Sequence, residues 1–299
     1  MMSTAALARW FDDLSPPIRG AIWMLLAAAC LTGMSAAVRH LSFSLHTFEI
    51  VFFRTMLALP FMLPWLIRTG AGAMRTRRLG MFAIRGVVTM TATTCFFWGL
   101  ALVPLADATA IMFTRPLFGA VLAMVVLHEL VRTRRWTGIA VGFVGVLIVL
   151  RPAFDQLNAG VVLVLVAALF ASVAAILVSH LARTESPDTI TMYHAIALTL
   201  LSAMPAALVW RTPSWDDAGW ILAMGFFGTL GQRTMTRALA AADVSIVLPV
   251  DFTRLLFAAA VGFALFGERP EIWTWIGGTI IFASTVFLAR GETNTKRTA

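Results

Sequence analysis

Charged residues are scarce in this 299-residue sequence, at 13% of the chain, whereas 60% of the residues are hydrophobic. Soluble globular domains carry about 25% charged residues, so the composition excludes an ordinary soluble domain. Only one tyrosine and one lysine are present, and the net charge of +8 therefore comes almost entirely from arginine. The arginines lie in short segments between long apolar runs, which indicates membrane orientation rather than nucleic-acid binding.

Signatures of catalysis, metal binding and nucleotide binding are also missing. The two cysteines, Cys30 and Cys95, lie inside apolar runs, so neither a disulfide framework nor a CxxC metal or redox site is indicated. No GxxxxGK[ST], HExxH or GxSxG motif is present, and this excludes a P-loop ATPase on this chain. We therefore predict no catalytic residues, no metal and no cofactor, and a protein that is not an enzyme.

Apolar runs long enough to cross a hydrocarbon core as a helix, about 20 residues each, fill nearly the whole chain. We predict ten membrane-spanning helices, over 18–39, 47–68, 79–101, 105–127, 134–151, 159–182, 189–210, 216–238, 244–266 and 272–290. The predicted fold class is an all-α integral membrane protein without a separate soluble domain.

Basic residues between the spans are distributed unevenly over the two sides of the membrane. With the N-terminus in the cytoplasm, 14 of them flank the spans on that side. The other side receives four, which are Arg39, Arg151, Arg211 and Arg269. Because basic residues are retained on the cytoplasmic side, we predict a multi-pass protein of a bacterial inner membrane, with both tails, 1–17 and 291–299, in the cytoplasm.

An internal repeat is visible in the hexapeptide FTRPLF at 113–118, which has a near-copy, FTRLLF, at 252–257. An offset of 139 or 140 residues aligns further identities: Gly86 with Gly225, Glu129 with Glu268, and His40-Leu41 with His180-Leu181. We predict two five-helix repeats, 18–151 and 159–290. Because five is odd, the second repeat is inverted in the membrane, an arrangement typical of transporters with a site between the halves.

The end of the fourth span in each predicted repeat carries an acidic motif, LHE at 127–129 and FGERP at 266–270. A Trp/Gly-rich span follows each motif, RWTGIAVGFVG at 135–145 and TWIGGTIIFAS at 274–284. With these motifs the chain resembles the drug/metabolite transporter superfamily, as two EamA-type halves, and within it the YddG-type exporters of aromatic and other amino acids. The resemblance implies ten helices around a central cavity and export of small metabolites, most of all amino acids, by alternating access.

Other functions remain open on the sequence alone. These are transport of drugs or nucleotide sugars and, from a different class, catalysis by an integral membrane enzyme. The expected partners are a small-molecule substrate such as an amino acid and the lipid bilayer, without nucleic acid. Glycine-rich faces on the fifth and tenth spans serve either packing within the chain or a dimer contact, so we expect a monomer or a weak dimer.

Arginines inside the predicted spans are the first candidates for a binding site, because a guanidinium there needs a partner or water. They are Arg54, Arg85, Arg115, Arg233 and Arg254. Asp251 stands three residues before Arg254 on the same helical face, whereas the equivalent residue before Arg115 is Met112. We therefore expect Arg115 to face the cavity and bind a substrate carboxylate, with Met112, Asp251 and Arg254 as further cavity residues. The alternative is that Arg115 contacts backbone carbonyls or an acid such as Glu49.

Aromatic and polar residues supply the remaining candidates. Phe97 and Trp98 are candidates for an apolar cavity wall, with lipid contact as the alternative, while Tyr193 and Gln232 are candidates for polar contacts with substrate. His194 is a candidate for coupling transport to the proton gradient, because histidine titrates near physiological pH. The alternative for His194 is a neutral imidazole that is hydrogen-bonded to a neighbouring helix.

Overall fold

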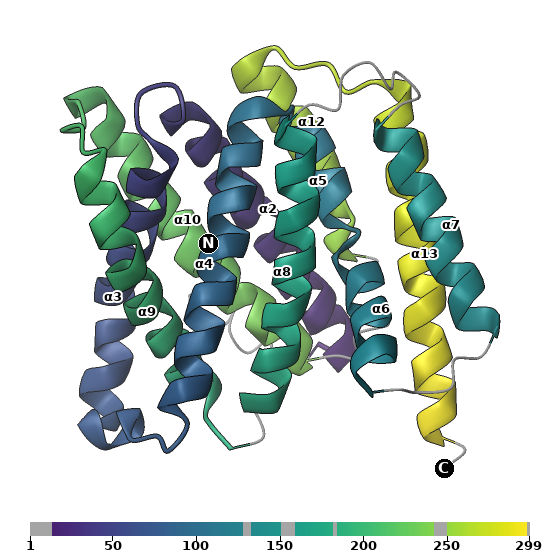
Figure 1. Ribbon diagram of the computed structural model, residues 1–299, viewed down its shortest axis with the longest axis horizontal. Coiled ribbons are helices and arrows are strands. Elements are labelled where there is room, and N and C mark those ends of the chain that lie inside the picture. Colours follow the sequence, from purple (N-terminus) through teal and green to yellow (C-terminus); the bar gives the residue numbers. More distant parts are fainter. Residues whose placement is uncertain (1–13, 128–132, 151–158, 182–183, 242–249, 298–299) are drawn as a thin grey trace.

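The computed structural model describes residues 14–127, 133–150, 159–181, 184–241 and 250–297, which form a bundle of helices running up and down side by side (Figure 1). The first half contains α2 (Pro16–Leu41), α3 (Thr47–Thr69), the 3-10 helix η1 (Ala71–Met74), α4 (Leu79–Leu102), α5 (Leu105–Met112), α6 (Arg115–Leu127) and α7 (Thr133–Leu150). The second half contains α8 (Ala159–Leu181), α9 (Pro187–Leu208), α10 (Trp215–Ala241), α12 (Thr253–Phe266) and α13 (Ile272–Arg297). The predicted all-α fold is confirmed, because helices cover most of the described residues of each predicted span.

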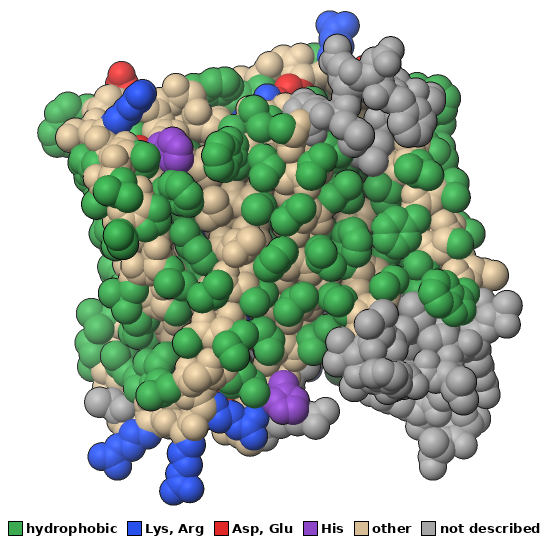
Figure 2. Space-filling view, viewed as in Figure 1, with side chains coloured by type: hydrophobic (Ala, Val, Ile, Leu, Met, Phe, Trp, Pro, Cys, Tyr) green, Lys and Arg blue, Asp and Glu red, His purple; other side chains and the backbone are tan. Residues whose placement is uncertain are grey.

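The outside of the bundle is suited to lipid. Five helices, α2, α3, α4, α8 and α9, are long and apolar enough to cross a membrane by length and composition. On the face drawn in Figure 2, hydrophobic side chains cover the bundle between its two ends, and basic side chains lie at both ends. Leu200, Met204 and Leu208 on α9 are 69%, 74% and 78% exposed. Such a belt is unfavourable in water but matches a hydrocarbon core.

The hexapeptide repeat marks an interruption in the helices. The span predicted as one helix over 105–127 is instead two helices, and α5 ends where the first hexapeptide begins. Pro116 has no N–H to donate, so the helical hydrogen-bond ladder cannot continue unbroken through this point. In the second half, α12 likewise begins within the hexapeptide, directly after Phe252. The rings of Phe113 and Phe252 contact each other, with centroids 5.4 Å apart, so the two interruptions meet between the halves.

Packing between the helices repeats from one half to the other, as inverted repeats require. The pair α2 and α10 has its counterpart in α8 and α4, while α3 packs on its own counterpart α9, and α7 on its counterpart α13. The contact of α7 with α13 is close because a Cβ on Gly145 would lie 2.9 Å from the carbonyl oxygen of Gly277. These glycines therefore pack within the chain, one of the two uses expected of them.

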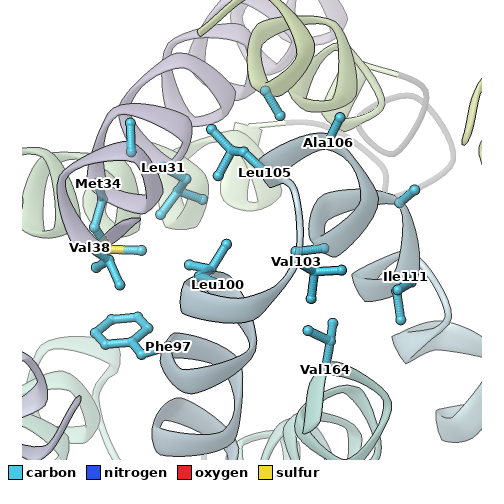
Figure 3. Packing of buried hydrophobic residues seen from close by; sticks show 14 of the residues in the cluster. Leu31, Met34, Val38, Phe97, Leu100, Val103, Leu105, Ala106, Ile111 and Val164 are labelled. Carbon is cyan, nitrogen blue, oxygen red and sulfur yellow. The ribbon is translucent and has the colours of Figure 1, made fainter. Parts of the chain in front are cut away.

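The apolar core lies where the two halves face each other. Figure 3 shows Met34 and Val38 of α2 above Phe97 and Leu100 of α4, with Val164 of α8 nearby. All five are buried. This core fixes the spacing of α2, α4 and α8, against which the polar sites described next are positioned.

Candidate substrate cavity

A cavity of about 50 Å³ lies between α3, α9 and α10, and therefore between the two halves. Its lining residues are Arg54, Thr55, Ala58, Met62, Thr191, His194, Ala195, Gly228, Thr229, Gln232 and Arg233. Two guanidiniums and an imidazole lie among apolar and neutral polar groups, and none of these residues is acidic. This volume is well below that of an ordinary small-molecule site, about 300–1,000 Å³, so a substrate fits only when the helices move apart. Chemically, the lining suits a small ligand with an apolar body and a negatively charged group.

Arg54 is a charged residue of the lining whose side chain has no hydrogen-bond partner among the described residues. Its guanidinium carbon lies 5.8 Å from the centre of the Phe97 ring. Its Nε is buried without a hydrogen-bond partner, and no hydrogen bond or ion pair joins Arg54 to any residue that the structure describes. Its N–H donors are therefore available to a ligand in the cavity.

His194 reaches the same cavity from α9. Its Nδ1 is buried without a hydrogen-bond partner, and the charges that act on it are the guanidiniums of Arg85 and Arg54. Arg85 itself donates from Nη1 to the carbonyl oxygen of Ile190, 2.9 Å away. The 140-residue offset of the repeat places Arg54 and His194 at equivalent positions, so corresponding points of the two halves meet here. A role of His194 in proton coupling stays a prediction.

The arginines of the two hexapeptides lie together elsewhere. Arg115 does not line this cavity, and the charges that act on it are those of Arg254 and Asp251. The guanidinium carbon of Arg254 lies 5.8 Å from the centre of the Phe113 ring. Asp251 Oδ1 is buried without a hydrogen-bond partner, and no ion pair joins Asp251 to Arg254 among the described residues. Carboxylate binding by Arg115 stays a prediction, as do the cavity roles of Asp251 and Arg254.

Glu49, the acid proposed as an alternative partner for Arg115, is engaged elsewhere. It is fully buried near the start of α3, where Oε2 accepts from the backbone N–H of His46 at 2.9 Å. Its Oε1 accepts from the backbone N–H of Arg211 at 2.6 Å. Glu49 therefore caps α3 and ties it to the segment after α9.

Among the other predicted cavity residues, only Gln232 and His194 line the cavity. Phe97 is 2% exposed and belongs to the core, so it touches the site only through Arg54. Met112 packs against the same core. Neither residue contributes to the described lining.

Tyr193 and Trp98 lie apart from the cavity. The Tyr193 hydroxyl donates to the carbonyl oxygen of Met74 at 2.6 Å, and its ring stacks on Phe82 with centroids 4.4 Å apart. Trp98 is 43% exposed, and its ring meets His46 edge-on. In this structure Tyr193 joins α9 to the segment before α4, and Trp98 lies on the outside of the bundle.

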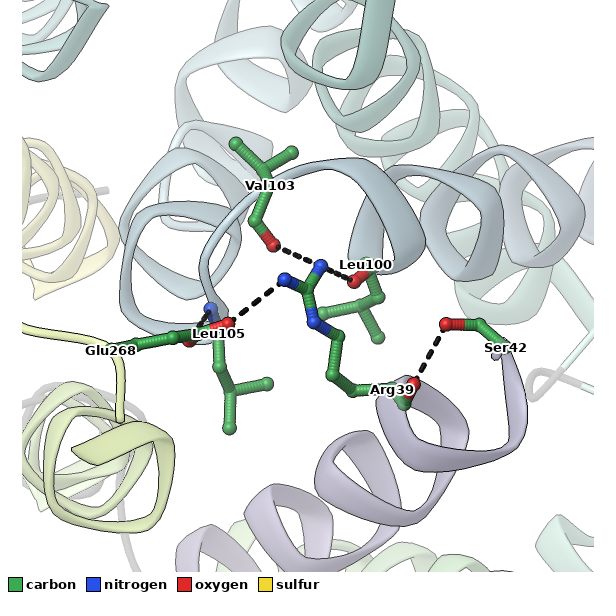
Figure 4. A network of polar contacts seen from close by, with 6 residues as sticks. All are labelled: Arg39, Ser42, Leu100, Val103, Leu105 and Glu268. Atoms are coloured by element: carbon green, nitrogen blue, oxygen red, sulfur yellow. Dashed lines mark hydrogen bonds and ion pairs between the residues drawn. The ribbon is translucent and has the colours of Figure 1, made fainter. Parts of the chain in front are cut away.

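A second polar cluster lies at the end of the bundle where α2 ends and α5 begins (Figure 4). Arg39 Nη2 and Glu268 Oε1 form an ion pair at 3.0 Å. Arg39 Nη1 also donates to the carbonyl oxygens of Leu100 and Val103, and Glu268 Oε2 accepts from the backbone N–H of Leu105 at 2.8 Å. The cluster thus ties α2 and the α4–α5 junction of the first half to the α12–α13 connection of the second.

Only part of this cluster has a signal in the sequence. Glu268 belongs to the acidic motif of the second repeat, whereas Arg39 counted only toward orientation. His128 and Glu129, in the matching motif of the first repeat, lie outside the described residues.

Comparison with known proteins gives one family match. The model of the EamA-like transporter family matches residues 18–151 and 158–290. One solved crystal structure, 17% identical, aligns with a TM-score of 0.62 over 90% of this chain and 98% of that chain, which supports the fold alone.

Curated relatives align over nearly the whole chain. The sequence is 27% identical to an S-adenosylmethionine uptake transporter of Rickettsia prowazekii (strain Madrid E), over 94% of this chain and 96% of that protein. It is 29% identical to a riboflavin transporter of Vibrio cholerae, with 94% and 96% covered. It is 28% identical to a pseudopaline exporter of Pseudomonas aeruginosa, with 91% and 96% covered. None of these names concerns aromatic amino acids, so the resemblance to YddG-type exporters is not supported, whereas the superfamily is.

Proposed function

Because the chain belongs to the EamA-like transporter family, we propose that this secondary transporter carries small metabolites bearing a carboxylate, amino acids first among them, across a bacterial inner membrane. The observation that carries the substrate class is the cavity between α3, α9 and α10. It presents Arg54, Arg233 and His194 to its ligand and no acidic side chain. A carboxylate supplies the negative charge that such a lining lacks.

The rest of the cavity supports an amino acid as the ligand. Ala58, Met62 and Ala195 offer an apolar surface for a side chain, and Thr229 and the Gln232 carbonyl oxygen offer acceptors for an ammonium group. The relatives described above are named as transporters of small organic solutes, which supports a small-molecule substrate for this protein. Their names include both uptake and export, so the export expected from the sequence is a proposal about direction in its own right.

Counterflow in proteoliposomes tests this function. Vesicles preloaded with unlabelled phenylalanine should accumulate labelled phenylalanine from outside, and recovered label should have an unchanged mass, as expected of a transporter. Unlabelled amino acids should compete, whereas a lipophilic cation should not. Competition by the cation alone, or by riboflavin but no amino acid, would contradict the proposed substrate class. Vesicles loaded on either side then establish the direction.

Orientation is the second part of the proposal, with both termini in the cytoplasm as the arginine distribution favours. Gly72 and Trp215 are exposed at opposite ends of the bundle, since one follows α3 and the other begins α10. In a background with Cys30 and Cys95 replaced by alanine, a cysteine at 215 should react with an impermeant reagent in intact cells. A cysteine at 72 should react only after permeabilisation, and the reverse pattern would invert the topology.

A further inference from the structure

Charge in the cavity is unbalanced. Arg54 and Arg233 both line it, His194 presents an unpartnered Nδ1, and the lining contains no carboxylate. Inside an apolar bundle a cationic group is unfavourable unless an anion or water accompanies it. A lining with several donors and no acid is therefore incomplete without an anionic ligand.

Arg54 differs from other arginines of the bundle in what it contacts. Arg39 has Glu268 and two carbonyl oxygens, and Arg85 donates to the carbonyl of Ile190. Among the residues that the structure describes, the interaction partner of the Arg54 guanidinium is the ring of Phe97. A ring face attracts the guanidinium charge but accepts none of its hydrogen bonds in the plane, so the planar fork stays free for a two-pronged contact.

The neighbours of Arg54 in the cavity are small residues. Gly228 on α10 presents no side chain, and Thr55 and Ala58 on α3 are small. The repeat places His194 opposite, at the position in α9 equivalent to Arg54 in α3, and these two helices pack together. A ligand bound at Arg54 thus contacts both halves at the place where they correspond.

We infer that Arg54 forms a bidentate pair with the substrate carboxylate and thereby makes the transporter prefer anionic over neutral ligands, with His194 and Arg233 as additional donors. This inference rests on the proposed function, because it names the residue that recognises the carboxylate. It also differs from the expectation for Arg115, which lies outside the cavity lining. Arg54 is therefore a specificity-determining residue.

Benzoate and benzamide form a suitable probe pair, because they share a ring and size and differ in the charge of one group. Their binding to the purified full-length protein is measured in detergent by calorimetry, without any need for transport. Wild type should bind benzoate at least about tenfold more tightly than benzamide, and Arg54→Gln should weaken benzoate about 10- to 100-fold while leaving benzamide unchanged. Arg54→Lys, which keeps the charge but not the fork, should fall between the two.

The controls separate a binding role from a loss of fold. Arg237→Gln removes an exposed guanidinium that lies over Trp23 on the same bundle and should bind like wild type. Each variant must also elute as wild type does on size exclusion, and benzamide binding confirms the intact cavity of Arg54→Gln. Phenyl phosphate supplies a second anion, and it should bind more weakly than benzoate.

Several results would overturn the inference. They are equal binding of benzoate and benzamide by wild type, an undiminished benzoate preference in Arg54→Gln, a loss confined to Arg115→Gln, and a preference for phenyl phosphate over benzoate. Failure of the proposed function shows itself separately, as absent counterflow of amino acids in vesicles whose protein still distinguishes benzoate from benzamide. Successful counterflow without that distinction would leave the transporter standing and remove Arg54 from recognition.

Discussion

Arg39 and Arg54 both project from helices of the first half, yet their surroundings are opposite. Arg39 is joined to Glu268 and to two backbone carbonyls, and Glu268 in turn accepts from Leu105. Arg54 touches the Phe97 ring and otherwise faces the cavity. The Arg39 guanidinium is bound within the protein through both terminal nitrogens, and it joins the two halves at one end of the bundle. The Arg54 guanidinium has no hydrogen-bond acceptor among the described residues, so its donors are available to a ligand.

The difference shows that an arginine in an apolar bundle is informative only together with its partners. A side chain whose terminal nitrogens are engaged, as both are in Arg39, contributes to stability, and its removal leaves orphaned acceptors. A side chain with free donors contributes little to stability and much to binding. Stability and ligand affinity should therefore respond in opposite ways to substitution at the two positions.

The largest effect is expected for Arg39→Leu. The change leaves Glu268 without its ion-pair partner and two carbonyls without a donor, so the free energy of unfolding should fall by about 3 kcal/mol. Unfolding by SDS in mixed micelles measures this change. A loss below about 0.5 kcal/mol would mean that the cluster holds nothing together.

Glu268→Gln should have a smaller effect on the same cluster. The amide oxygen still accepts from Leu105, but the charge that pairs with Arg39 is gone, so a loss of about 1–2 kcal/mol is expected. The matched control is Arg269→Gln, which changes the exposed neighbour and should lie within about 0.5 kcal/mol of wild type. Equal losses in both variants would contradict a specific ion pair.

Phe97 allows the contact of Arg54 with the protein to be measured on its own. In a double-mutant cycle of Phe97→Leu and Arg54→Gln, the coupling energy should be about 1 kcal/mol, as expected of a cation–π contact away from bulk water. The same cycle with Arg237→Gln in place of Arg54→Gln should give no coupling. A coupling of zero with Arg54 would show that the ring does not hold this guanidinium.

Arg54→Gln should produce the smallest change in stability, within about 0.5 kcal/mol of wild type. The lost ring contact is offset by removal of a guanidinium that has no hydrogen-bonded partner in the protein. A loss as large as that of Arg39→Leu, measured in the same micelles, would erase the distinction between the two sites.

Much of the fold could be predicted because it follows from hydrophobic runs and their count. Ten apolar runs of sufficient length predict ten spans. The odd number of spans in each repeat predicts that the second repeat is inverted in the membrane. The interruption at Phe113–Thr114 was not predicted, although Pro116 supplied a cause, because kinked and broken helices contain prolines alike. The contact between the rings of Phe113 and Phe252 was also not predictable, because these residues are distant in the sequence.

The cavity lining was harder to predict, because the rotation of each helix about its axis decides which of its residues face the cavity. Tyr193 and His194 are adjacent in sequence, yet only His194 lines the cavity, since neighbours on a helix point about 100° apart. Arg54 is an arginine within a predicted span, but its place in the cavity lining depends on α9 and α10, which are distant in the sequence. The expectation for Arg115 relied on its own helix alone and so lacked this information.

Carboxylate recognition by Arg54 can be tested by a crystal structure of the protein with 4-bromobenzoate. Anomalous scattering locates the bromine atom and thereby shows which way the ligand points. If Arg54 recognises the carboxylate, both of its terminal nitrogens should lie within about 3 Å of the carboxylate group, and the ligand ring should pack against α9 and α10. Density for the ligand at Arg115, or in the cavity with its carboxylate turned away from Arg54, would contradict it.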